Sequence, residues 1–180
     1  VGIVVSGTVS RGVLAANAEL LLGPEPDGSF TPVFVRTIHA KRMSVETCQA
    51  GDSCAISLRS LNKKKTLKRA HIRRGMVLVD PKVTIPRIIN GLQANPIATR
   101  SFEAEVLVLH HPTTIKMCYQ AVIHCGNLRQ TASIDQINKE CLRTGDKAMI
   151  RWTFMLRPEY IHPDQTFIFR EGECTSIETG

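Results

Sequence analysis

The stretch Gly2-Ile-Val-Val-Ser-Gly-Thr-Val-Ser-Arg-Gly12 decides the fold of this chain. Apolar residues recur in it at every second position, and a period of two is typical of a β-strand with one buried face. Gly7 and Gly12 bracket this strand and the turn that follows, where a residue without a Cβ atom permits a positive φ or a close backbone approach. The segment therefore predicts a strand that enters a tight turn.

Similar alternating runs continue to the end of the chain, separated by Gly, Pro, Asn or Asp, and helical patterns are nearly absent. Many short strands joined by turn residues are typical of a barrel or a sandwich. The predicted strands are 2–9, 18–22, 32–39, 53–59, 76–80, 102–110, 119–125, 130–137, 147–155 and 165–170. The fold class that this pattern predicts is all-β.

One segment in the middle of the chain breaks the rhythm, because it is rich in proline, glycine and asparagine. We expect a first β-barrel over 1–85, a linker or inserted loop over 86–98, and a second β-barrel over 99–180. The residues before Thr99 include 14 basic and 6 acidic side chains, and those from Thr99 onward include 9 and 10. Two consecutive antiparallel barrels of different charge are therefore expected.

The composition excludes several classes of protein. The chain has 180 residues, of which 43% are hydrophobic and 22% charged, so it has enough apolar side chains for a core. Its apolar runs are much shorter than the roughly 18 residues of a membrane span. The sequence opens at Val1 on a strand-like run, without the charged and apolar leader of a signal peptide. We expect a cytoplasmic protein and part of a longer chain.

The positive charge is concentrated in one segment. The net charge is +7, and the run Asn62–Arg74 contains seven basic residues and no acidic one, which leaves 16 of each sign elsewhere. Such a run is the electrostatic signature of contact with nucleic-acid phosphates. It is equally typical of a solvated surface loop. Both interpretations stay open at this point.

The six cysteines lack the spacing of a metal site or a disulfide framework. They are Cys48, Cys54, Cys118, Cys125, Cys141 and Cys174, with no C-x-x-C pair among them, and the six histidines form no H-x-x-x-H pair. A large aliphatic core makes disulfides unnecessary. We expect free thiols and no bound metal.

Six motifs in a fixed order resemble a known superfamily. The first three are the stretch 2–12, Gln49-Ala-Gly-Asp52 and Ile72-Arg-Arg-Gly-Met-Val-Leu-Val79; the next three are Phe102–His110, Leu142–Asp146 and Phe167–Gly172. They are similar to the second and third domains of translational GTPases related to elongation factor Tu. Within that superfamily the sequence most resembles the family of eukaryotic GTP-binding protein 1, through the segments 38–43, 110–114 and 122–131. The basic loop and the linker are longer than the family pattern, so their role cannot be inferred from it.

The resemblance implies a translation-protein-type barrel followed by an elongation-factor C-terminal-type barrel. It also implies a parent protein that hydrolyses GTP. This chain has no G-x-x-x-x-G-K-[ST] phosphate loop, no Asp-x-x-Gly and no Asn-Lys-x-Asp motif. We therefore expect no catalytic residue and no cofactor here, with GTP and Mg²⁺ bound by a GTPase domain that precedes Val1.

The family role suggests which residues bind nucleic acid. His39 and Arg42 correspond to the pocket for the aminoacylated end of tRNA, although the two residues are equally compatible with an exposed turn. Gln120, His124, Asn127, Arg129, Gln130, Arg170 and Gly172 correspond to the surface that contacts the T-stem, where Glu171 would repel phosphate. The basic loop adds Lys63, Lys64, Lys65, Lys68 and Arg69.

Three functions remain as hypotheses. The leading one is a non-catalytic double barrel that faces aminoacyl-tRNA and the ribosome. The alternative is a protein-interaction module that docks the parent's GTPase domain or a partner in RNA turnover. A small-ligand barrel is the third and weakest, because no polar cluster converges within an apolar pattern. In each case we expect a monomer with no membrane association.

Overall fold

We analysed a computed structural model of the chain, which describes residues 2–62, 66–81, 96–163 and 165–171. The chain divides into two compact units. The first comprises Val1–Glu25 and Ser29–Ile97, and the second comprises Pro26–Gly28 and Ala98–Gly180. Most of the predicted linker 86–98 lies outside the described residues.

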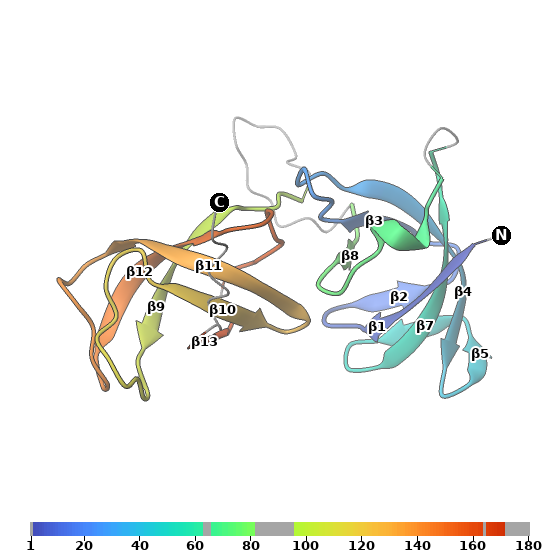
Figure 1. Cartoon of the computed structure of the whole chain (residues 1–180). Coiled ribbons are helices and arrows are strands. Elements are labelled where there is room, and N and C mark those ends of the chain that lie inside the picture. Colours follow the sequence, from blue (N-terminus) through green and yellow to red (C-terminus); the bar gives the residue numbers. More distant parts are fainter. Residues whose placement is uncertain (1, 63–65, 82–95, 164, 172–180) are drawn as a thin grey trace, which may run out of the picture. The chain divides into compact units, whose positions relative to one another are not determined.

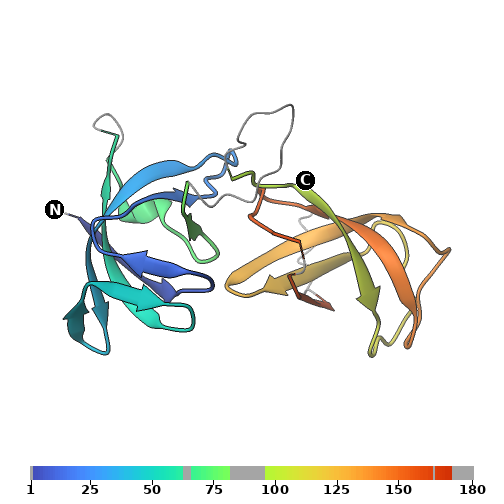
Figure 2. The same cartoon turned by 180° about the vertical axis from the view of Figure 1, so that it is seen from behind.

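The first unit is built on a curved antiparallel sheet (Figures 1 and 2). Its strand order is β1-β7-β4-β3-β8, β5 pairs with β4, and β2 and β6 form a separate two-stranded ribbon. A single turn of 3-10 helix, η1 (Arg69–His71), precedes β8. The strands are β1 (Ile3–Thr8), β2 (Val13–Ala15), β3 (Glu19–Gly23), β4 (Thr31–Ala40), β5 (Met43–Val45), β6 (Thr47–Gln49), β7 (Ser53–Ser60) and β8 (Val77–Val79).

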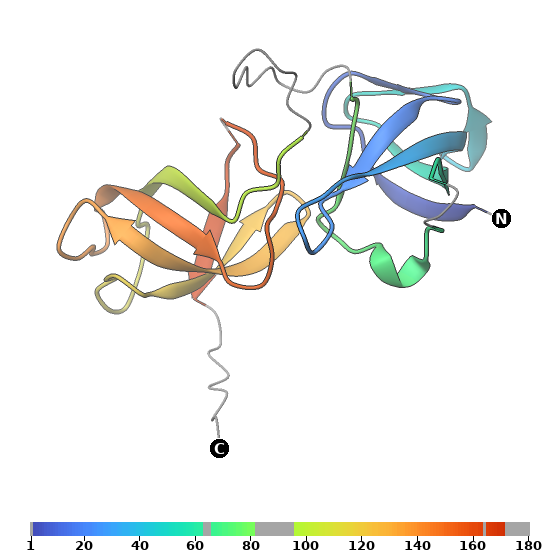
Figure 3. The ribbon, with the colours of Figure 1, turned by 90° about the horizontal axis from the view of Figure 1, so that it is seen from above.

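The second unit is a curved five-stranded antiparallel sheet (Figure 3). Its strand order is β13-β10-β11-β12-β9. The strands are β9 (Ser101–Leu107), β10 (Gln120–Cys125), β11 (Leu128–Ile137), β12 (Lys147–Phe154) and β13 (Ile168–Glu171). The prediction of an all-β chain with two consecutive antiparallel barrels is confirmed.

Each predicted strand corresponds to a strand in the structure, and three further strands were not predicted. These are β2, β5 and β6, which have only three residues each and bury little of their surface. A strand of this length offers too few positions for the period of two to be recognised.

Each unit has its own apolar core. In the first, Val33, Val35 and Leu58 are fully buried. In the second, Trp152 and Phe154 are fully buried, and the ring of Phe169 lies 5.4 Å from that of Trp152. These aromatic residues therefore belong to the core and not to a surface on which bases could stack.

The two units repeat one topology. If the five strands of each path are numbered along the chain, both sheets have the order 1-4-3-2-5. The third strand of each also carries an irregularity at the same place, between Val35 and Thr37 in β4 and between Ile134 and Gln136 in β11. The chain thus contains a structural duplication.

The two Gly-Asp corners belong to this duplication. In the first unit, the backbone N–H of Gln49 donates to Asp52 Oδ2 at 2.9 Å, and in the second, the N–H of Arg143 donates to Asp146 Oδ2 at 2.7 Å. The glycine before each aspartate has a positive φ, 98° at Gly51 and 89° at position 145. The matching hydrogen bonds and positive φ values show that the two corners are equivalent parts of a repeat.

A second pair of equivalent residues is Asn17, just before β3, and Cys118, just before β10. Asn17 and Cys118 have φ values of 65° and 66°. The N–H of Asn17 donates to the carbonyl of Val35, and the N–H of Cys118 donates to the carbonyl of Ile134, each at 2.9 Å. Cys118 therefore has the same left-handed backbone and the same hydrogen bond as its counterpart in the first unit.

Candidate nucleic-acid interface

The outer face of β10, β11 and β13 brings together four of the predicted residues. His124 is paired with Arg129 across β10 and β11, and Arg170 is paired with Val122 across β13 and β10. Gln120, at the start of β10, is on the same face two pleats from His124. We call this surface the polar face and define it by Gln120, Val122, His124, Arg129, Thr131, Ser133, Ile168 and Arg170.

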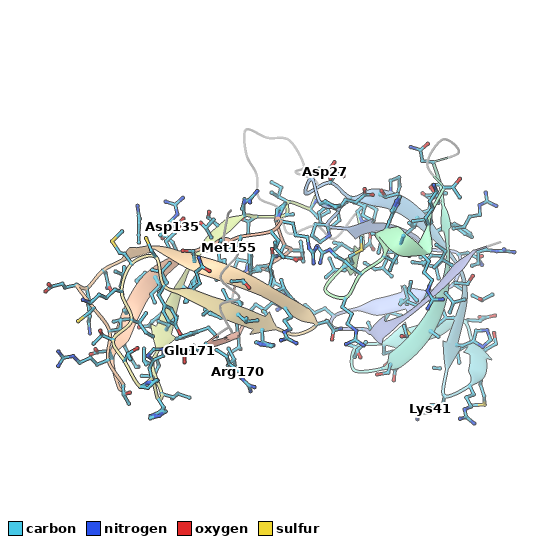
Figure 4. All side chains as sticks on the ribbon, in the orientation of Figure 1. Asp27, Lys41, Asp135, Met155, Arg170 and Glu171 are labelled. Carbon is cyan, nitrogen blue, oxygen red and sulfur yellow. The ribbon has the colours of Figure 1, made fainter. Side chains whose placement is uncertain are left out.

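The polar face is accessible and positively charged. Gln120, Arg129 and Arg170 are exposed and His124 is half-buried. Arg170 points away from the sheet, and Glu171 follows it on β13 (Figure 4). Because successive residues of a strand leave it on opposite faces, the carboxylate of Glu171 does not share the outer face with Arg170.

Asn127 extends this face at the turn between β10 and β11. The turn consists of Gly126, with a φ of 56°, and the exposed Asn127. It holds an amide next to the His124–Arg129 pair. Gly172, which was predicted to belong to the same surface, lies outside the described residues.

Gln130 is a correction to the predicted set. Its side chain is only 3% exposed. Its Nε2 donates to the carbonyl of Arg157 at 3.1 Å and to Glu159 Oε1 at 2.9 Å. Its Oε1 accepts from the N–H groups of Leu156 at 3.0 Å and Arg157 at 2.8 Å. The amide is used to hold the segment after β12, so Gln130 is not available to a ligand in this structure.

In the first unit, His39 lies in a row of small side chains. The register places Ser6 opposite Ala55, Ala55 opposite His39, and His39 opposite Ser44. His39, Ser6 and Ser44 are exposed. Apart from His39 this row has only small side chains, and it carries hydroxyl groups beside an imidazole, so a planar group could approach the sheet closely. The alternation of β1 and β7 could have placed Ser6 and Ala55 on this face, whereas Ser44 lies on the three-residue strand β5, which the sequence does not reveal.

Arg42 lies beside His39 at the tip of the hairpin formed by β4 and β5. The turn consists of Lys41, which Figure 4 labels, and Arg42. Their φ values are 50° and 66°. Both are exposed. A two-residue hairpin turn with positive φ at both positions favours Asn-Gly, so two long cations there occupy strained backbone. Lys41 is a second cation at this site that the sequence analysis did not single out.

The basic loop is only partly described. Lys63, Lys64 and Lys65 lie outside the described residues. Lys68 and Arg69, at the start of η1, are exposed. Arg74, three residues after the end of η1, is also exposed.

The described thiols are free, and burial raises the pKa of two of them. Cys48, Cys54, Cys118, Cys125 and Cys141 form no disulfide. Burial, followed by the neighbouring Cys48 and then Asp52, raises the pKa of Cys54 to about 11. Burial also raises the pKa of Cys125. These two side chains remain neutral thiols at physiological pH.

The described ranges contain neither a metal-binding cluster nor a membrane-spanning helix. No group of three or more His, Cys, Asp or Glu side chains is arranged to hold a metal ion there. Nor does any helix in those ranges have the length and apolar character needed to cross a membrane.

Comparison with known proteins places this geometry in a family context. No protein-family model matches the chain. Three similar proteins are GTP-binding protein 1 of Xenopus laevis, 48% identical over 179 residues, GTP-binding protein 2 of Mus musculus, 36% identical over 178 residues, and elongation factor 1-alpha of Cenarchaeum symbiosum, 27% identical over 182 residues. The chain is similar over nearly its whole length to one segment of each of these GTP-binding and elongation-factor proteins. The resemblance inferred from the six motifs is thereby confirmed.

The similarity covers nearly all of this chain but only a part of each relative. It includes 99% of the chain and 25% of the Xenopus protein, 98% and 27% for the mouse protein, and 93% and 36% for the archaeal elongation factor. The chain therefore spans about a quarter to a third of the length of these relatives.

Proposed function

We propose that this double barrel is a non-catalytic, RNA-facing part of a translational GTPase, which holds aminoacyl-tRNA and meets the ribosome in the cytoplasm. The observation that carries the proposal is the polar face, where strand pairing gathers His124, Arg129 and Arg170 on one side of three adjacent strands. Duplex RNA is recognised mainly through phosphates and 2′-hydroxyl groups, and exposed guanidinium, imidazole and amide groups suit both.

The hairpin of the first unit supports the same proposal. His39, the hydroxyl-bearing row beside it and the cationic turn at Lys41 and Arg42 offer a flat surface bordered by charge. We propose that this surface receives the aminoacylated end of tRNA. A rigid sheet suits the role because it fixes the position of the side chains that meet the ligand.

We propose that GTP is bound elsewhere in the parent protein. The sequence has no Gly-rich phosphate loop, and the described residues contain no set of three metal-binding side chains. We therefore propose that GTP and Mg²⁺ are bound by residues beyond this chain, and that the double barrel contributes binding and no chemical step.

The proposal is tested with the variant Arg129→Gln/Arg170→Gln. Each phosphate contact contributes about 0.9 to the slope of log affinity against log salt concentration for a duplex. Binding of the variant to tRNA should weaken, and the slope should fall by up to about 1.8. Titration of fluorescently labelled tRNA at several salt concentrations measures both quantities.

The matched control is Lys147→Gln/Arg151→Gln, which removes two exposed cations from the outer face of β12. It changes the net charge equally and leaves the polar face intact. An equal loss of affinity in both variants, or none in the first, would contradict RNA contact at the polar face.

A protein-interaction module is the second candidate, and one surface favours it. On the outer face of β9 and β12, Leu107 is 46% and Met149 48% exposed, and Leu109 just beyond β9 is 81% exposed. Exposed apolar side chains bordered by charges are typical of a docking surface. The variant Leu107→Ser/Leu109→Ser separates the hypotheses. Docking predicts loss of a protein partner such as the parent's GTPase domain with tRNA binding unchanged.

A further inference from the structure

The basic run is mounted on the core of the first unit by its apolar residues. We call residues 66–76 the basic turn. Leu67, Ile72 and Met76 pack against the buried core cluster. The Nη2 group of Arg73 donates to the carbonyl of Pro24 at 3.3 Å. The turn is therefore fixed to the barrel at several points.

The backbone of the turn is held as well. Within η1, the N–H of His71 donates to the carbonyl of Lys68 at 3.0 Å, and the N–H of Ile72 donates to the carbonyl of Arg69 at 3.1 Å. The Nη1 group of Arg73 also donates to the carbonyl of Arg74 at 3.2 Å. Arg73 thus links the C-terminal part of the turn both to the barrel and to its own backbone.

The outer surface of the turn carries only positive charge. Lys68, Arg69 and Arg74 are exposed, and none of them forms an ion pair with another described residue. The whole segment 62–74 contains no acidic residue. Its large apolar side chains face the core, so the outside lacks the apolar centre that a protein interface requires.

We propose that the basic turn is a built binding site for the phosphodiester backbone of RNA, distinct from the polar face; the choice of RNA rests on the proposed function. Guanidinium groups bind phosphate oxygens through two parallel hydrogen bonds, and an ammonium group adds a point charge. A turn fixed before binding loses little conformational entropy when it meets its ligand, whereas a free lysine-rich loop has to be ordered. Arg73 is a positioning residue in this site.

The first test removes the outer charges with Lys68→Gln/Arg69→Gln/Arg74→Gln. Affinity for a short synthetic RNA duplex should fall roughly tenfold or more, and the salt slope by up to about 2.7. The control Lys116→Gln/Lys147→Gln/Arg151→Gln removes three exposed cations from the second unit. An unchanged affinity in the first variant, or an equal loss in the control, would overturn the proposal.

The second test loosens the mount without changing the charge. Arg73→Lys loses the planar fork that reaches Pro24, and Leu67→Ala removes an apolar anchor. Both should weaken duplex binding several-fold while circular dichroism shows an unchanged fold; if either variant fails to fold, the other decides. Unchanged affinity for the duplex in the folded variant would show that the basic run attracts RNA by its net charge alone. That result would contradict a binding site whose geometry is fixed by the barrel.

The third comparison separates RNA from an acidic protein surface and this site from the polar face. Poly-L-glutamate replaces the RNA duplex in the same titrations. Loss of polyglutamate binding by the charge variant, with RNA binding intact, overturns the proposal in favour of an acidic protein partner. If the charge variant of the basic turn loses RNA binding while Arg129→Gln/Arg170→Gln has no effect, the result supports the basic turn as the RNA site. It also refutes RNA contact at the polar face.

Discussion

The side-chain amide of Gln130 donates a hydrogen bond of 2.9 Å to the carboxylate of Glu159, which is 1% exposed. The Nε group of Arg157 also donates to this carboxylate, at 3.3 Å. The backbone of Glu159 pairs in both directions with Thr99, the first residue of the predicted second barrel. One buried polar cluster therefore fixes the segment after β12 to the start of the second unit's sheet.

Replacing Gln130 by Leu should destabilise the second unit and leave RNA contact unaffected. The substitution removes the acceptor of the N–H groups of Leu156 and Arg157 and one of the donors to the buried carboxylate of Glu159, at a cost of about 1–3 kcal/mol for each group left unsatisfied. Urea unfolding should show a loss of about 3 kcal/mol or more in the free energy of unfolding. Unchanged stability together with weaker tRNA binding would restore Gln130 to the interface.

A second prediction concerns the strained turn at Lys41 and Arg42. The variant Lys41→Asn/Arg42→Gly places at the two positive-φ positions the residues that tolerate them best. It should raise the free energy of unfolding by about 1–2 kcal/mol and weaken tRNA binding. Thermal unfolding and tRNA titration on the same samples measure the two effects. Gain of stability with binding retained would show that the cations have no role in binding.

Most residues of the polar face could be predicted from the sequence, and Gln130 is the predicted residue that does not belong to it. Alternation along β11 places Arg129 outward and Gln130 on the same side as the buried Leu128 and Ala132. The family resemblance nevertheless implies RNA contact for both residues, although neighbouring residues of one strand face opposite sides of the sheet. The alternation of buried and exposed residues along this strand therefore predicts, without the structure, that Gln130 is buried.

The basic turn illustrates what the sequence could not provide. Its charges are obvious in the run Asn62–Arg74, which is equally typical of a solvated loop. The distinction depends on Leu67 and Ile72 reaching the core and on Arg73 reaching the carbonyl of Pro24, a residue 49 positions earlier. Contacts between residues so far apart in sequence follow from the closure of the barrel, and no local pattern encodes them. The repeat of the two units was hidden for a similar reason, since it lies mainly in strand order, and the shared Gly-Asp corners are too common a turn to reveal it.

A third prediction concerns pH and the Arg143–Asp146 corner. Hydrogen bonds from the backbone N–H of Arg143 and from the side chain of Lys139 hold the pKa of Asp146 below its usual value. Because the pKa is lower in the folded state, this interaction stabilises the fold above the unfolded pKa of about 4 and is lost as pH falls through the folded value. Asp146→Asn should therefore be less stable than the parent chain at pH 7, and the difference should shrink toward pH 2. Urea unfolding at the two pH values measures it, and a constant difference would contradict the assignment.

The duplication of the two units yields a fourth prediction, at Cys118. Its φ of 66° matches that of Asn17 at the equivalent place, and asparagine tolerates this left-handed region better than other residues with a Cβ. The Cys118 side chain is exposed, so its replacement removes no core packing. Cys118→Asn should raise the free energy of unfolding by about 0.5–1 kcal/mol, and Cys118→Val should lower it, because a β-branched residue fits this backbone poorly. Thermal unfolding of the two variants compares them directly. Equal stability of both would show that the backbone at position 118 relaxes out of the left-handed region, and that the second unit does not need the conformation that Asn17 adopts in the first.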